Sequence, residues 1–177
     1  MIATLALYAG VASGSDVILI PEIPFDIDIV CRFVESRMNR NRGFSIVVVA
    51  EGAKPAGGEA VVAKVDPTSP DPIRLGGIGE RVARQIGERT GIETRTTVLG
   101  HVVRGGPPVP SDRVLASQFG HHAMELLMQG ATGRMVVMRD GQLSDVDILH
   151  TANRQRLVPL DYSLIKVAKA VRTSFGV

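Results

Sequence analysis

The stretch from Glu93 to Arg113 constrains the fold more than any other part of this chain. The β-branched residues of Thr94–Leu99, closed by Gly100, predict a strand that ends at His101. A loop of glycine and proline follows, and Ser111 is then expected to cap a helix whose apolar residues recur at helical spacing. Strand, polar loop and helix form the unit that builds ligand sites at the carboxyl edge of an open α/β sheet.

The rest of the chain continues this alternation. The unbroken β-branched run Ile46–Val49 within Ser45–Ala50 is typical of a parallel strand buried on both faces. Between Gly52 and Leu75 only Ala60–Val65 has strand character. We therefore predict an α/β fold with an open, largely parallel sheet flanked by helices. We also expect a strand over 17–20 and helices over 26–41, 78–90 and 161–172, the last of them capped by Asp161. A hairpin of strands 134–138 and 142–148 is expected around the turn Asp140-Gly141.

The composition excludes several classes of protein. A length of 177 residues suits one domain, and 45% hydrophobic residues are enough for a packed core. The net charge is +2, no long basic run occurs, and Trp is absent, so we expect no nucleic-acid partner. The single cysteine, Cys31, leaves no disulfide framework and no structural zinc site, which favours a cytoplasmic protein.

Residues Met1 to Ser15 carry no charge and allow two interpretations. Small residues at Ala12, Ser13 and Gly14 mimic a signal-peptide cleavage site, but the positive segment that should precede the apolar core is missing. The segment is also shorter than the ~20 residues that cross a bilayer as a helix, so we expect no membrane association. The other interpretation is a helix buried against the sheet.

Three cationic or imidazole donors gather in and beside the central loop. Arg95, His101 and Arg104 have little acidic character between them. Guanidinium groups match phosphate oxygens, and an imidazole adds a further donor. The pattern predicts a site for an anion such as a phosphate ester. Arg37, Arg40 and Arg42 could form a second anion patch, or could be solvated cations near the C-terminus of a helix.

Several blocks of the sequence resemble the bacterial-type 6-phosphofructokinase family, in the same order as in that family. The resemblance covers nearly the whole chain but only the C-terminal part of a family subunit, and the last two blocks resemble the subgroup that includes pyrophosphate-dependent enzymes. The blocks are L-A-L-Y-A-G (5–10), D-V-I-L-I-P-E (16–22), V-V-V-A-E-G-A (47–53), T-R-T-T-V-L-G-H-V-V-R-G-G (94–106), S-D-R-V-L-A-S (111–117), V-P-L-D-Y-S-L-I-K (158–166) and T-S-F-G (173–176).

The resemblance implies a phosphotransferase of glycolysis that moves a phosphoryl group from ATP or pyrophosphate to the 1-hydroxyl of fructose 6-phosphate. It implies Arg95, His101 and Arg104 as the clamp on the 6-phosphate and Glu51 as the partner of the sugar hydroxyls. Because the family arginine that matches Arg95 reaches into a neighbouring subunit's site, the resemblance implies a homo-oligomer, a dimer or tetramer. Glu22 matches an effector-binding glutamate of allosteric members, or is an ordinary loop carboxylate.

Two family motifs have no counterpart in this sequence. They are the Gly-Gly-Asp-Gly donor loop and the Thr-Ile-Asp-Asn-Asp motif, which holds the catalytic aspartate. We therefore expect residues 1–177 to be the sugar-phosphate-binding part of a subunit that lacks its N-terminal donor-binding half, a truncated form that is inactive alone. By resemblance the donor brings Mg²⁺, for which this chain has no ligand residues. The alternative is a non-catalytic sugar-phosphate-binding or subunit-interaction module.

Overall fold

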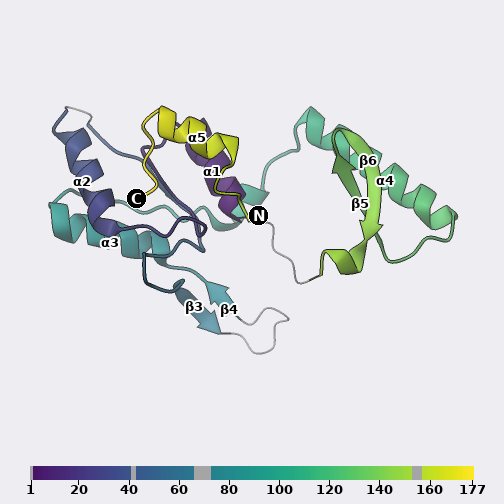
Figure 1. Ribbon diagram of the computed structural model, residues 1–177, viewed down its shortest axis with the longest axis horizontal. Coiled ribbons are helices and arrows are strands. Elements are labelled where there is room, and N and C mark those ends of the chain that lie inside the picture. The colour runs from purple at the N-terminus through teal and green to yellow at the C-terminus, as the bar shows by residue number, and fades with distance from the viewer. Residues whose placement is uncertain (1, 41–42, 66–72, 153–156) are drawn as a thin grey trace. The chain divides into compact units, whose positions relative to one another are not determined.

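The computed structural model describes residues 2–40, 43–65, 73–152 and 157–177 of the chain (Figure 1). The chain forms two compact units. Unit 1 comprises residues 1–98 and 156–177, and unit 2 comprises residues 99–155.

The centre of unit 1 is a pair of parallel strands, β1 (Val17–Leu19) and β2 (Val47–Val49). Val17 also forms a parallel bridge to Ser174 near the C-terminus. All three residues of β1 are fully buried, as expected for an apolar run inside a covered parallel sheet. Both predicted strands are confirmed, although each is shorter than its apolar run.

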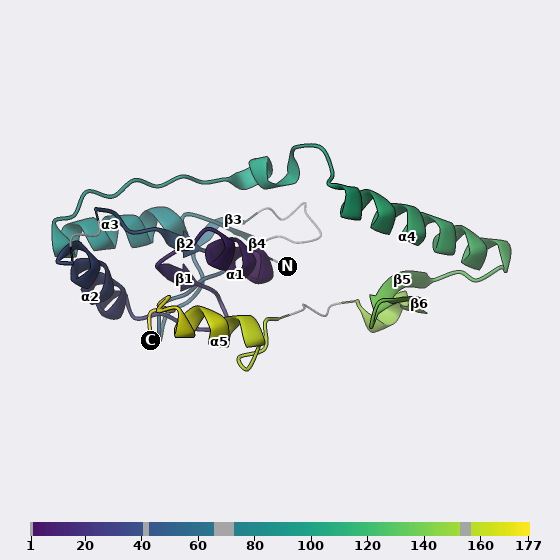
Figure 2. The same ribbon diagram turned by 90° about the horizontal axis from the view of Figure 1, so that it is seen from above.

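Helices cover both faces of this pair. Alternate side chains of β1 point to opposite sides of the sheet, and each set packs against different helices. Ile18 and Ile20 lie in a core cluster with residues of α1 (Ile2–Ala12) and α5 (Ser163–Ala170). Val17 and Leu19 lie in a second cluster with residues of α2 (Ile27–Met38) and α3 (Ile78–Thr90). The α2 and α3 helices also pack against each other (Figures 1 and 2). The α/β class predicted from the sequence is thereby confirmed.

The helix boundaries agree with the sequence pattern to different degrees. Helix α3 spans the predicted residues, and α2 begins after Asp26, whose carboxylate accepts a hydrogen bond of 2.8 Å from Asp28 N. The predicted cap of α5 is wrong, since the N-cap position belongs to Tyr162. The cause is a turn in which Tyr162 N donates to Pro159 O (3.0 Å) and which takes up Asp161 before the helix begins.

The other strands pair antiparallel. In unit 1, β3 (Val62–Val65) pairs with β4 (Ile73–Leu75), in the region where the sequence indicated only one weak strand. In unit 2, β5 (Arg134–Arg139) pairs with β6 (Gln142–Asp147) as the predicted hairpin. Asp140 and Gly141 both have positive φ, 49° and 77°, which is the conformation of a two-residue hairpin turn that follows the strand twist. Parallel pairing among the described residues is therefore confined to unit 1.

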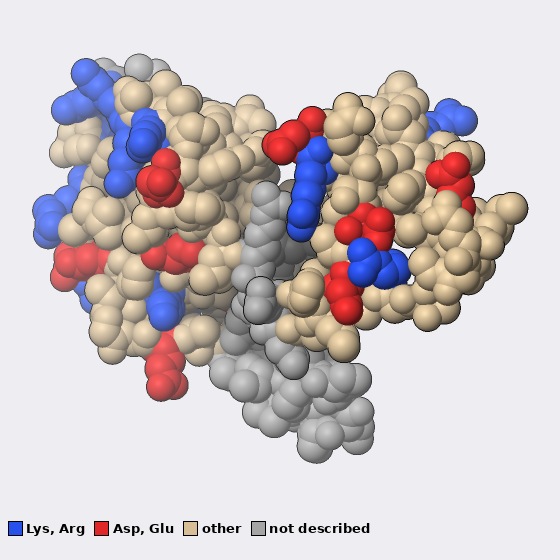
Figure 3. Space-filling view, turned by 45° about the vertical axis from the view of Figure 1, so that its right-hand side comes forward, with Lys and Arg blue, Asp and Glu red and all other residues tan. Residues whose placement is uncertain are grey.

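Unit 2 also contains the short 3₁₀ helices η1 (Gly100–Arg104) and η2 (Ile148–His150) and the long helix α4 (Pro110–Met128). Helix α4 packs against both strands of the hairpin (Figure 2). None of the described residues of unit 2 is buried. On the face drawn in Figure 3, much of unit 2 carries no Lys, Arg, Asp or Glu side chain. This unit therefore has secondary structure without a core of its own.

Two predictions for the central stretch are wrong. Residues 91–99 have no regular secondary structure, and no backbone hydrogen bond joins residues 93–98 to another described residue, so this β-prone segment has no strand partner. Ser111 does not cap α4. The helix begins at Pro110, whose ring favours the first helical position, and Asp112 accepts the Val109 N–H at 3.2 Å.

Candidate functional site

Two glutamates follow the carboxyl ends of the parallel strands. Glu22 comes after β1 and Glu51 after β2, and the register pairs Leu19 with Val49, so both turns leave the same sheet edge. Glu51 is exposed and makes no hydrogen bond or ion pair with any described residue. A carboxylate in this setting is available to accept hydrogen bonds from a ligand's hydroxyl groups.

Glu22 is engaged within unit 1. Its Oε1 atom accepts a hydrogen bond of 2.9 Å from the backbone N–H of Val158, on the segment that leads into α5. Its Oε2 atom is buried and has no partner among the described residues. The hydrogen bond favours the interpretation of Glu22 as a loop carboxylate with a structural role.

Arg95 lies on the extended segment after α3 and points into solvent. Its side chain is 89% exposed, and Nη2 and Nε lie 3.0 and 3.1 Å from Oε1 of Glu93. An ion pair at this exposure contributes little to stability, on the order of 0 to 1 kcal/mol. The guanidinium can therefore leave Glu93 for another anion at small cost.

His101 and Arg104 are brought together by η1. In a 3₁₀ helix the side chains at positions i and i+3 eclipse each other, so the imidazole and the guanidinium project from the same side. Both residues are exposed, and neither has an acidic partner among the described residues. The pair forms a two-pronged donor suited to a phosphate group. Its shape depends on the 3₁₀ turn, which replaces the end of the strand predicted there.

The four candidate residues thus lie on three different elements. Glu51 and Arg95 belong to unit 1, on the turn after β2 and the segment after α3. His101 and Arg104 belong to unit 2. Only the last two share an element.

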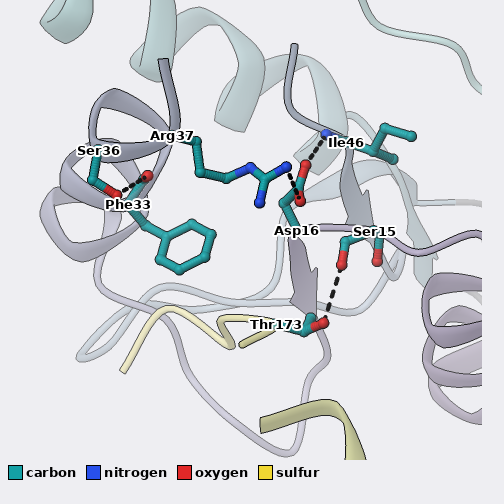
Figure 4. A network of polar contacts seen from close by, with 7 residues as sticks. All are labelled: Ser15, Asp16, Phe33, Ser36, Arg37, Ile46 and Thr173. Carbon is teal, nitrogen blue, oxygen red and sulfur yellow. Dashed lines mark hydrogen bonds and ion pairs between the residues drawn. The ribbon is translucent and has the colours of Figure 1, made fainter. Parts of the chain in front are cut away.

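The sequence left open whether Arg37, Arg40 and Arg42 form a second anion patch, and the structure does not support that interpretation for Arg37. Its Nη2 atom forms an ion pair of 2.7 Å with Oδ1 of Asp16, whose side chain is only 8% exposed (Figure 4). The Oδ2 atom of Asp16 accepts the Ile46 N–H at 2.9 Å. Arg37 therefore serves to hold β1, α2 and the start of β2 together. Arg40 is exposed, and Arg42 lies outside the described residues.

The described residues offer no group of three His, Cys, Asp or Glu side chains that could hold a metal ion. None of the helices in the described ranges combines the length and the apolar character that crossing a membrane requires.

Comparisons with known proteins identify the family. The phosphofructokinase family model matches residues 2–127. An ATP-dependent 6-phosphofructokinase of Spirochaeta thermophila is 45% identical over 97% of this chain and 47% of its own length. A pyrophosphate-fructose 6-phosphate 1-phosphotransferase of Streptomyces coelicolor is 46% identical over 87% of this chain and 45% of its own length. The chain therefore spans about half the length of these curated relatives.

Solved structures agree with the sequence matches. Phosphofructokinase from Saccharomyces cerevisiae aligns with a TM-score of 0.67 and 29% identity, and covers 95% of this chain and 20% of its own. A pyrophosphate-dependent phosphofructokinase from Nitrosospira multiformis shares the fold, with a TM-score of 0.65 and 22% identity over 88% of this chain and 40% of its own. Because the family model matches well over half of the residues, and the fold and the relatives agree with it, this chain belongs to the phosphofructokinase family.

Proposed function

We propose that residues 1–177 form the sugar-phosphate-binding part of a 6-phosphofructokinase, which transfers a phosphoryl group from ATP or pyrophosphate to the 1-hydroxyl of fructose 6-phosphate. The observation that carries the proposal is the two-pronged donor on η1, where His101 and Arg104 are exposed and lack acidic partners among the described residues. Such a pair is suited to hold the 6-phosphate, because hydrogen bonds to ionised phosphate oxygens are strong.

Glu51 and Arg95 are the other two residues that we propose to bind the substrate. Glu51 accepts hydrogen bonds from sugar hydroxyls, and its exposure without a competing partner among the described residues supports this role. Arg95 adds a second guanidinium to a phosphate group. Since Arg95 projects into solvent from an extended segment, we propose that it serves the site of a neighbouring subunit in a homo-oligomer.

The donor side of the reaction is proposed to lie in a second half of the subunit. The curated relatives are about twice as long as this chain, and they include ATP-dependent and pyrophosphate-dependent enzymes. Phosphoryl transfer depends on positioning and on charge neutralisation by a metal ion that bridges donor oxygens. We propose that Mg²⁺ arrives with the donor, that the other half of the subunit holds both, and that the complete enzyme acts in glycolysis in the cytoplasm.

Calorimetry with fructose 6-phosphate tests the acceptor site in this chain. Arg104→Ala is expected to weaken binding by about 1.5 to 3 kcal/mol, the usual worth of a hydrogen bond to a charged group. Arg139→Ala is the matched control, because Arg139 is an exposed arginine of unit 2 on β5. Equal affinities for Arg104→Ala and the unmodified chain would remove Arg104 from the site.

A coupled assay tests the division of the subunit. The chain alone is expected to transfer no phosphoryl group from either donor, because its sequence has no counterpart of the family's donor loop or of the motif that holds the catalytic aspartate. Activity should appear when the chain is mixed with the N-terminal half of the Spirochaeta thermophila relative. Turnover by the chain alone at an ordinary kinase rate would contradict the proposal.

A second candidate function is a non-catalytic module that binds sugar phosphates or a complete subunit. The sequence feature that favours it is that residues 1–177 contain no counterpart of the family's donor loop or catalytic-aspartate motif. Failure of the mixed halves to react, with intact binding of fructose 6-phosphate, would favour the module.

A further inference from the structure

The two tyrosines of the chain meet on the surface of unit 1. The sequence contains only Tyr8, in α1, and Tyr162, the N-cap residue of α5. Their hydroxyl oxygens lie 2.6 Å apart, in a hydrogen bond between residues 154 positions apart in the sequence. The ring centroids are 6.5 Å apart, and the ring planes are tilted by 40°. The contact lies where α1 packs against α5 (Figure 1).

The tyrosine pair is accessible to small molecules in solution. Tyr8 is 51% exposed, Tyr162 is half-buried, and the hydrogen bond between them is itself exposed. Contact between two aromatic rings stabilises the packing of the elements that carry them. That packing does not require the two hydroxyl groups to meet, so the position of the two oxygens calls for a further explanation.

Few other side chains of this chain compete for a one-electron oxidant. Trp is absent, and the single cysteine, Cys31, is buried. Cysteine oxidation follows thiolate character and exposure, and burial both shields the Cys31 thiol and raises its pKa. Among the aromatic and thiol side chains, the two phenols are therefore the ones that a one-electron oxidant attacks most readily.

The hydrogen bond prepares the two rings for coupling. A phenol that loses one electron also releases its hydroxyl proton, and the unpaired electron is then shared between the oxygen and the two Cε carbons beside it. Because the hydroxyl oxygens of Tyr8 and Tyr162 are hydrogen-bonded, the Cε atoms of both rings flank the same contact. Rotation about the side-chain torsions of these surface residues brings one Cε atom of each ring together.

We propose that Tyr8 and Tyr162 form a site of oxidative modification, at which a one-electron oxidant joins the two rings through a Cε–Cε bond and so links α1 to α5 covalently. The step takes one electron and one hydroxyl proton from each phenol. After the carbon–carbon bond has formed, the hydrogen on each joined carbon moves to the oxygen of the same ring, so both hydroxyl groups are restored. The site shares no residue with the proposed fructose 6-phosphate site and does not depend on that proposal.

Photo-oxidation of the dilute full chain with tris(bipyridine)ruthenium and persulfate tests the site, since each persulfate takes up two electrons and becomes two sulfate ions. The expected product is a monomeric chain that has lost two hydrogen atoms, shows the blue fluorescence of dityrosine and yields a peptide pair joined at Tyr8 and Tyr162. Oxidised methionines gain oxygen, so mass spectrometry distinguishes them. In urea, which separates the two rings, this product should be lost.

Three variants test whether the native contact is responsible. Tyr8→Phe and Tyr162→Phe keep the rings that pack between α1 and α5, and each should abolish the monomeric product. The matched control combines Tyr8→Phe with Phe44→Tyr, which keeps two tyrosines but moves one of them to an exposed position before β2. This control should form no cross-link within the monomer. The proposal is overturned if the control couples as the unmodified chain does, if urea leaves the yield unchanged, or if dityrosine forms only between chains.

The stability of the cross-linked chain gives a second readout. A covalent link between residues 154 positions apart lowers the conformational entropy of the unfolded chain, so the Tm should rise. Tyr8→Phe, treated with the same oxidant, controls for damage elsewhere in the chain and should show no such rise. An unchanged or lower Tm of the cross-linked chain would contradict a link that forms in the native geometry.

Discussion

Asp16 and Arg37 join the start of β1 to the last turn of α2 through an ion pair of 2.7 Å between Oδ1 and Nη2 (Figure 4). The second carboxylate oxygen of Asp16 accepts the backbone N–H of Ile46, three residues before β2 ends. Val17, the residue that follows Asp16, also forms a parallel β-bridge to Ser174. One buried carboxylate therefore fixes the relative positions of β1, β2 and α2.

Asp16→Asn should destabilise unit 1. The substitution keeps the shape of the side chain but removes the charge that Arg37 faces, and a loss of about 1 to 3 kcal/mol is expected from leaving a partly buried group unpaired. Urea denaturation measures this loss in the free energy of unfolding. The control is Asp28→Asn, which breaks the exposed ion pair of Asp28 with Arg89 and should cost less than about 1 kcal/mol. Equal losses in the two variants would refute a special role for Asp16.

Glu22 and Glu51 provide a matched pair at one sheet edge. Glu22→Ala removes the acceptor of the Val158 N–H and should lower stability by on the order of 1 to 2 kcal/mol, whereas Glu51→Ala removes no hydrogen bond to a described residue and should leave Tm unchanged. Thermal unfolding distinguishes them. The affinity for fructose 6-phosphate should respond the other way: Glu51→Ala should reduce it and Glu22→Ala should not. An unchanged Tm for Glu22→Ala would show that its contact is dispensable.

Gly176 is required by the packing of the C-terminal segment. It has a φ of 75°, and a Cβ atom there would lie 2.7 Å from Cβ of Phe25 and 3.1 Å from Cγ2 of Val30. Gly176→Ala should therefore cost about 2 to 5 kcal/mol, the sum of left-handed strain and overpacking. Gly14→Ala, at a φ of 66° with open space around it, should cost only about 1 to 2 kcal/mol. Similar losses in denaturant titrations would show that the close contact relaxes.

Burial raises the pKa of the Cys31 thiol above its ordinary value. The thiol is therefore expected to resist iodoacetamide at pH 8 in the native chain and to react quickly in urea, since the thiolate is the reactive species. Because the thiol pKa is higher in the folded chain than in the unfolded chain, there is a pH range in which the folded chain keeps the thiol proton and the unfolded chain has lost it. The stability gained from this group is full below the unfolded pKa and is lost as the pH rises through the folded pKa.

Cys31→Ala isolates that contribution. The difference in unfolding free energy between the unmodified chain and the variant should shrink as the pH rises above about 8.5, the ordinary thiol pKa. A difference that is constant up to pH 11, or rapid alkylation of the native chain, would contradict the assignment.

Unit 2 should drive self-association of the isolated chain. Its described residues include no buried side chain, and Val102, Met128 and Leu149 are 76%, 82% and 74% exposed. Apolar surface of this extent is typical of a contact with other polypeptide. Sedimentation velocity at high concentration should show oligomers, and the triple variant Val102→Ser, Met128→Gln and Leu149→Ser should show fewer. A monodisperse monomer of the unmodified chain would contradict the prediction.

The sequence by itself determined those elements whose signals are local. The apolar runs predicted β1 and β2, the apolar spacing predicted α3, and Asp140-Gly141 predicted the β5–β6 hairpin. Each of these signals comes from conformational preferences of neighbouring residues. The kinds of residue in the candidate site were also evident, because Arg95, His101 and Arg104 lie close together in the chain.

Tertiary structure decided whatever depends on a distant partner. Residues 94–99 have strand preference but no neighbouring strand among the described residues, and β-preference without pairing does not make a strand. Asp16, which lies 21 positions before Arg37, pairs with that arginine and excludes it from the anion patch that the sequence left open. The 3₁₀ turn that aligns His101 with Arg104 arises only when the backbone folds, because its geometry depends on contacts that no local pattern contains.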